Sequence, residues 1–191
     1  MKEVLTITPQ ATLKRVAANL GLKTLPKMQG TTRAVYDTVA LPAAAGGSAV
    51  FFDGVGARPF PASNITTNRF EVNSALAVQA IAFYLVQDNG ADPALLSQFD
   101  GAGINRGFFD LIIGNQTVLK KTPINSGYQQ ITGRTVGSAR NKIWMQSPIV
   151  IPPQVRFKLE ARDLQAPAGT LNNIACVLYG TGVLLNTKTA L

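Results

Sequence analysis

The chain has 191 residues, a net charge of +8, one cysteine and no histidine; 46% of its residues are hydrophobic and only 15% are charged. The lack of histidine removes the commonest general base and metal ligand, and the single Cys176 excludes an intrachain disulfide and a thiolate metal cluster. Because about 25% of the residues of an average soluble protein are charged, we expect a charge-poor surface that is covered by neutral side chains or by partners.

Residues 1–30 are predicted to form a basic N-terminal arm, separate from a strand-forming body at residues 31–191. The arm contains one acid, Glu3, and no other acid precedes Asp37. A short helix is expected at about residues 9–22, where apolar residues recur at helical spacing. The candidate docking stripe on this helix consists of Leu13, Val16 and Leu20. The candidate contacts to nucleic-acid phosphates or anionic lipid are Lys2, Lys14, Arg15, Lys23 and Lys27. The alternative is a solvated tail.

The first half of the body predicts four strands, each bounded by glycine, proline, asparagine or aspartate turns. Their ranges are 32–41, 49–52, 69–72 and 75–87. Residues 75–87 are apolar at most positions, which is typical of a central strand covered on both faces. Aromatic and β-branched residues in this segment favour a strand over a helix.

The second half predicts a hairpin and then a series of closing strands. The hairpin joins residues 108–113 to 116–120 through Gly114-Asn115. The closing segments are 142–146, 148–153, 155–162 and 174–185. The third of these alternates, with Val155, Phe157, Leu159 and Ala161 expected inside and Arg156, Lys158, Glu160 and Arg162 outside. In the last segment, Gly180 and Gly182 are expected at a bulge or kink.

Long polar loops are expected at residues 88–107 and 126–141, with one helical turn at about 93–98. There is no internal repeat, and the strands do not alternate with helices. We therefore predict an all-β fold: a two-sheet antiparallel sandwich, a jelly roll of about eight strands, with a mostly extended or short-helical N-terminal arm. No continuous apolar run suits a signal peptide or approaches the ~20 residues that cross a bilayer.

No catalytic constellation is visible, so we expect no enzyme and no cofactor. The ten acids are scattered, and no histidine is present to activate a serine. The loop at Asp88 to Asp92, with Asp100 nearby, is open to two interpretations, a calcium site or a plain turn. Cys176 is expected to be a small buried hydrophobe. The aromatic residues are expected to pack in the core rather than to form a stacking platform: Phe51, Phe52, Phe83, Phe108, Phe109 and Trp144.

The order of these segments resembles the single jelly-roll coat proteins of small icosahedral viruses, especially tailless bacteriophages. Three stretches of the sequence carry the resemblance. They are NRFEV (68–72) leading into 75–87, FDLIIGN (109–115) followed by Pro123-Ile124, and the closing segments 148–153, 155–162 and 177–183. Together they cover about three-quarters of the chain, and the likeness is one of pattern rather than of a diagnostic motif.

The resemblance implies a virion structural protein that assembles with itself into an icosahedral shell. Such coats usually assemble with copies of themselves as trimers or pentamers, and their basic arms often lie on the inner side. Other virion proteins are expected as further partners. The arm would then face genome, internal membrane or a neighbouring subunit, and the protein would be made in the host cytoplasm and reside in the virion. Its five cations are few for a genome-packaging arm. The alternative is a receptor- or carbohydrate-binding β-sandwich module, and a sandwich-like or cupin-like enzyme is the third hypothesis.

Overall fold

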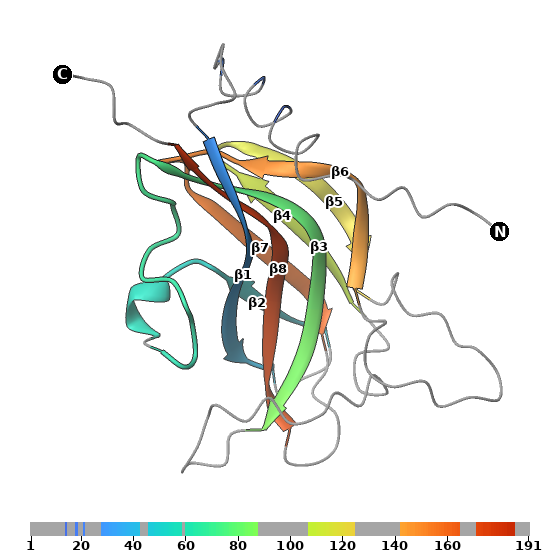
Figure 1. Ribbon diagram of the computed structural model, residues 1–191. Coiled ribbons are helices and arrows are strands. Elements are labelled where there is room, and N and C mark those ends of the chain that lie inside the picture. Colours follow the sequence, from blue (N-terminus) through green and yellow to red (C-terminus); the bar gives the residue numbers. More distant parts are fainter. Residues whose placement is uncertain are drawn as a thin grey trace, which may run out of the picture.

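The computed structural model describes residues 14, 18, 21, 28–42, 46–58, 60–87, 107–124, 142–164 and 171–185. These residues form eight strands and a short 3₁₀ helix, η2 (Val55–Ala57). The strands are β1 (Met28–Ala40), β2 (Gly47–Phe51), β3 (Ser74–Gln87), β4 (Phe108–Ile113), β5 (Gln116–Pro123), β6 (Lys142–Ile151), β7 (Phe157–Leu164) and β8 (Leu171–Leu185). They form two four-stranded antiparallel sheets (Figure 1).

The strand order identifies the sandwich as a jelly roll. Sheet A has the order β1-β8-β3-β6 and sheet B the order β2-β7-β4-β5. Strand 1 thus pairs with 8, 2 with 7, 3 with 6, and 4 with 5, as in one long antiparallel ribbon that turns back between β4 and β5. Pairing of β3 with β8 and of β4 with β7 wraps this ribbon into two sheets. The predicted fold class is confirmed.

Aromatic rings join the two sheets across the core. Phe51 of β2, Phe83 of β3 and Phe109 of β4 form a chain with ring centroids 5.9 and 5.1 Å apart, so sheet A inserts a ring between two rings of sheet B. Such contacts add to the stabilisation that comes from apolar burial. The alternation expected for β7 is confirmed at its buried positions Phe157, Leu159 and Ala161, although the strand begins at Phe157 rather than at residue 155.

A bulge lies where the sequence predicts one, opposite Gly180. The register of β3 with β8 shifts between Val78 and Ala80, which leaves Gln79 as the additional residue. At Gly180 the backbones approach so closely that a Cβ would lie 2.0 Å from the carbonyl oxygen of Ala77. Only glycine fits this contact, because any side chain would overlap the neighbouring strand.

The outer edge of β1 is partly covered by the segment that precedes β3. The amide of Thr38 donates to the Ala62 carbonyl (2.9 Å), and the amide of Asn64 donates to the Tyr36 carbonyl (3.3 Å). The side chain of Asn64 adds two bonds to the β1 backbone, at Tyr36 and Ala34. These contacts occupy groups that would otherwise template pairing with another chain.

Four sequence predictions are wrong in detail. Residues 69–72 form no strand, and Phe70 makes only a single bridge to Pro153. Residues 142–146 and 148–153 belong largely to one strand, β6, although its pairing with β3 is interrupted between Trp144 and Ile149. Strand β1 begins at Met28, inside the predicted arm. Trp144 lies outside the core, with 68% of its surface exposed. The predicted loop helix at 93–98 and the loop at 126–141 lie outside the described residues.

Candidate functional site

A buried ion pair connects β1 to the loop that follows β2. Asp37 is fully buried, and its carboxylate accepts two bonds from Arg58, Nε to Oδ1 at 2.9 Å and Nη2 to Oδ2 at 2.7 Å. The backbone amide of Phe52 also donates to Oδ2, at 2.6 Å. Arg58 donates in addition to the carbonyl of Asp53. Every contact of this carboxylate fixes the loop, and none leads to a groove, so the pair is interpreted as structural.

Sequence reasoning did not identify this pair. In the sequence Asp37 stands out only as the first acid after the arm, and Arg58 lies in a loop without a recognisable pattern. The available signal was the aspartate itself, because aspartate is depleted within strands and the neighbours of Asp37 are β-formers. An isolated acid at an inward position of a strand indicates a buried partner.

Cys176 lies beside Asp37 in the sheet and does not behave as a nucleophile. The two residues are register partners on β8 and β1. Burial raises the pKa of the Cys176 thiol, and the nearby Asp37 carboxylate raises it further. A thiol held in its neutral form is a poor nucleophile. The prediction of a small buried hydrophobe is confirmed.

The outer face of sheet A is almost free of charge. The described strands of this sheet contain only three charged residues: Arg33, Asp37 and Lys142. Arg33 and Asp37 each lie two residues from the core residue Val35. They therefore share its face of the strand and point inward. Lys142 is thus the one charged side chain that these strands place on the outer face. Much of that face consists of alanine and valine, including Ala80, Ala82, Ala175 and Val177, which are themselves buried, whereas Trp144 is exposed.

Aromatic side chains gather on the same outer face. The hydroxyls of Tyr84 and Tyr179 share a hydrogen bond of 2.8 Å, and the rings pack with Ala82 and Val177. The Nζ of Lys142 lies 4.0 Å from the ring centroid of Tyr179, within the range of a cation–π contact, and 6.0 Å from that of Trp144. Burial raises the pKa of Tyr84, and the hydrogen bond to Tyr179 adds to this effect. We call Tyr84, Tyr179, Lys142 and Trp144 the aromatic cluster.

Sheet B presents the opposite kind of surface. Glu160 on β7 forms ion pairs with Lys158 (2.7 Å) and Arg162 (2.8 Å), and the bond from Lys158 is the main reason that the pKa of Glu160 is lowered. Arg162 also lies 3.9 Å from Asp110 of β4. Arg162 is exposed and Lys158 and Glu160 are partly exposed, and such mutually paired charges are typical of a surface in contact with solvent.

Comparisons with known proteins identify no relative. No family model, no curated protein and no solved structure matches the chain. The surfaces must therefore be interpreted from their own chemistry.

Most of the predicted arm residues lie outside the described part of the chain. Lys14 is exposed and has helical backbone, as has Ala18, and the amide of Gly21 donates to the Ala18 carbonyl (3.2 Å). These two residues agree with the helix expected at 9–22. The other predicted contact and stripe residues lie outside the described residues: Lys2, Arg15, Lys23, Lys27, Leu13, Val16 and Leu20.

The described residues contain neither a metal-binding cluster nor a membrane-spanning helix. Among them, no group of three or more acids and cysteines is placed to hold a metal ion. The loop at Asp88 to Asp92 and Asp100 lies outside the described residues, so the calcium hypothesis stays a prediction. None of the described helical segments has the length and apolar character to cross a membrane.

Proposed function

We propose that this protein is a virion structural protein, a capsid subunit that assembles with copies of itself. The observation that carries the proposal is the contrast between the two sheets. The described strands of sheet A place one charged side chain, Lys142, and an exposed Trp144 on their outer face, whereas sheet B has an ion-paired outer face. Depletion of charge and enrichment in tryptophan and tyrosine distinguish the centres of protein interfaces from other surface. The jelly-roll topology and the low fraction of charged residues, 15%, support the same function.

The test is assembly of the full chain, measured by light scattering and negative-stain electron microscopy. We expect closed particles or capsomers for the wild type. Trp144→Glu introduces a charge into the aromatic cluster and is expected to block assembly. Val118→Glu is the matched control, because Val118 is also an exposed apolar residue (43%) but lies on β5 of sheet B. A wild type that stays monomeric, or a control that blocks assembly while Trp144→Glu does not, would contradict the proposal.

The arm requires a separate test. Residues 28–30 pair with β8, so a deletion that stops at Lys27 removes the arm without shortening β1. In the proposed function the arm contacts genome nucleic acid, internal membrane or a neighbouring subunit. The deletion is then expected to abolish binding to single-stranded nucleic acid or to anionic liposomes, or to weaken assembly. If all three stay unchanged, the arm has none of these roles.

The second candidate function is a receptor- or carbohydrate-binding module. The exposed ring of Trp144 favours it, because apolar faces of sugars stack on such rings. A stable monomer that binds glycans, and loses this binding in Trp144→Ala, would establish the second function in place of the first.

A further inference from the structure

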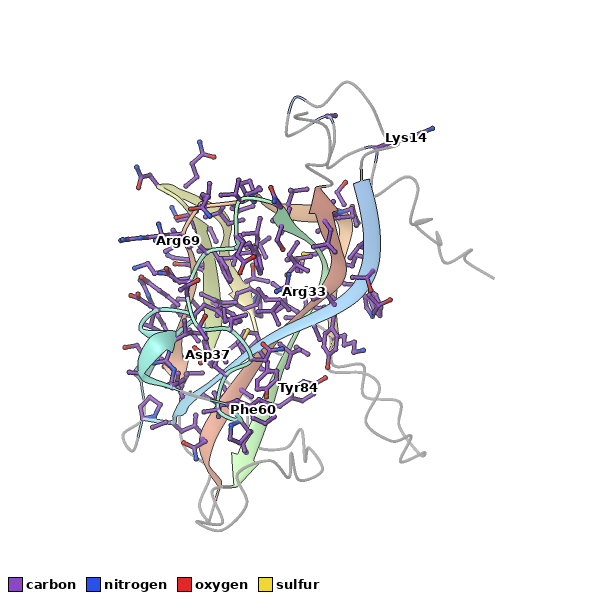
Figure 2. All side chains as sticks on the ribbon, turned by 60° about the vertical axis from the view of Figure 1, so that its left-hand side comes forward. Lys14, Arg33, Asp37, Phe60, Arg69 and Tyr84 are labelled. Atoms are coloured by element: carbon purple, nitrogen blue, oxygen red, sulfur yellow. The ribbon has the colours of Figure 1, made fainter. Side chains whose placement is uncertain are left out.

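A groove lies at one end of the sandwich, on the inner side of sheet A. It has a volume of about 370 Å³ and is bounded by β1, by Leu184 of β8 and by the segment between residues 64 and 74. Arg33 and Arg69 line it, together with the hydroxyl residues Thr66 and Ser74. Figure 2 shows Arg33 within the body and Arg69 at its margin. The groove is distinct from the aromatic cluster, which occupies the opposite face of the sheet.

Arg33 is held in position from three sides. Its stem lies against Gly182, where a Cβ would be only 2.9 Å from the Cδ of Arg33. Its guanidinium carbon is 4.9 Å from the ring centroid of Phe70, in a cation–π arrangement. Its Nη1 donates to the Oγ of Ser74 at 3.0 Å. The side chain is therefore pre-organised, and little rotamer entropy remains to be lost when it binds a ligand.

No acid neutralises this guanidinium in the part of the chain that the structure describes. The two arginines with ion pairs there are Arg58, paired with Asp37, and Arg162, paired with Glu160 and Asp110. A guanidinium has five N–H donors, and Ser74 accepts from one of them. A part-buried charge with unused donors, facing a groove, is suited to an anionic ligand.

The surrounding groups favour a phosphate over a carboxylate. The Oγ of Ser74 accepts from Arg33, so its own O–H can donate to a bound oxygen. Thr66 offers a second hydroxyl, and Arg69 a second guanidinium at the rim. Glu71 is the one acid that lines the groove, which leaves the set net positive. A phosphate has enough oxygens to accept from two arginines and a hydroxyl together.

We propose that this groove binds a phosphate group, with Arg33 as its principal ligand. The phosphate can belong to a free phosphate or nucleotide, or to the backbone of a single-stranded nucleic acid. The chemistry at Arg33 is the same in both cases. Phosphate binding would be separate from assembly. Arg33 lies on the core-facing side of sheet A, whereas the contact proposed for assembly uses the outer face of that sheet.

The experiment is calorimetric titration of the full chain with inorganic phosphate, with acetate at equal ionic strength as the comparison anion. Arg33→Gln keeps the stem against Gly182 and removes the charge. Arg156→Gln is the matched control, because Arg156 lines the other described groove together with an acid, Asp53. We expect Arg33→Gln to weaken phosphate binding at least about tenfold, the loss of one charged hydrogen bond, and the control to change it less than about twofold.

A short single-stranded oligonucleotide separates the two sources. Competition between oligonucleotide and phosphate, lost in Arg33→Gln, assigns the groove to a nucleic-acid backbone; phosphate binding without competition assigns it to a free phosphate or nucleotide. The proposal is overturned if the wild type binds no phosphate, binds acetate equally well, or loses nothing in Arg33→Gln. Where Arg33→Gln does not fold, Arg33→Lys keeps the charge without the bidentate fork, and an affinity equal to that of the wild type then overturns the proposal. Light scattering of the same variant reports assembly independently.

Discussion

The buried ion pair between Asp37 and Arg58 gives the sharpest test of the fold. The variant Asp37→Asn keeps the shape of the side chain and removes its charge. Breaking a buried pair by removing one partner costs about 3–5 kcal/mol of unfolding free energy, because the other charge is left without compensation. Arg58 is 26% exposed and can turn towards water, whereas Asp37 is fully buried. We therefore expect a loss of about 3 kcal/mol for Asp37→Asn and about 5 kcal/mol for Arg58→Met.

Thermal and urea unfolding at neutral pH measure this loss. For a domain of this size, each kcal/mol lowers the midpoint by about 2–4 °C, so we expect shifts of about 6–12 °C for Asp37→Asn and about 10–20 °C for Arg58→Met. The double variant should be more stable than Arg58→Met alone, because it leaves no buried charge. Glu160→Gln, in the partly exposed ion pairs of sheet B, is the control and should shift the midpoint far less. The reasoning is refuted if Arg58→Met destabilises no more than Glu160→Gln does.

Three further predictions concern single side chains. Gly180→Ala should destabilise the fold by about 3 kcal/mol or more in urea unfolding, since its Cβ would overlap the Ala77 carbonyl; a loss below about 1 kcal/mol would contradict the bulge geometry. The Cys176 thiol, with its pKa raised by burial, should resist alkylation in the native state at about pH 8 and react on unfolding, and rapid native labelling would contradict this. Because the pKa of Tyr84 is raised in the fold, its contribution to the free energy of unfolding is complete below about pH 10, the pKa of an unfolded tyrosine, and is lost as the pH rises above it. In Tyr84→Phe, unfolding titrations should no longer show this loss of stability at alkaline pH.

The sandwich was predictable because its strands carry their pattern in short windows of sequence. The long apolar run of β3, the alternation of β7 and the Gly114-Asn115 turn each identify an element without reference to the rest of the chain. Two features were not predictable in this way: the residue at which β1 begins, and the fact that residues 142–151 form one strand, β6, rather than two. Both depend on how far the neighbouring strands, β8 and β3, extend alongside them.

The candidate surfaces were less accessible to sequence reasoning. The apolar run around Trp144 predicts a position in the core, which is wrong. In the structure this tryptophan alternates with Ile143 and Met145, which pack against the core, while Lys142 shares the outer face with Trp144. That alternation was present in the sequence. The position of Arg33 over Phe70 could not be predicted from a local pattern, because the contact joins β1 to a loop 37 residues further along the chain.

The unequal distribution of charge separates two kinds of contact by their response to salt. A contact between copies through the outer face of sheet A involves Lys142 as its one charged side chain from the described strands, so it should change little between about 50 and about 500 mM salt. If the arm binds single-stranded nucleic acid, five cations are available for that contact: Lys2, Lys14, Arg15, Lys23 and Lys27. If four of them neutralise phosphates, the affinity should fall roughly 600-fold over the same tenfold change in salt. Light scattering and a fluorescent oligonucleotide measure the two responses in one titration. Particles that dissociate in step with the loss of nucleic acid would mean that the bound nucleic acid, and not the charge-poor outer face of sheet A, holds the copies together.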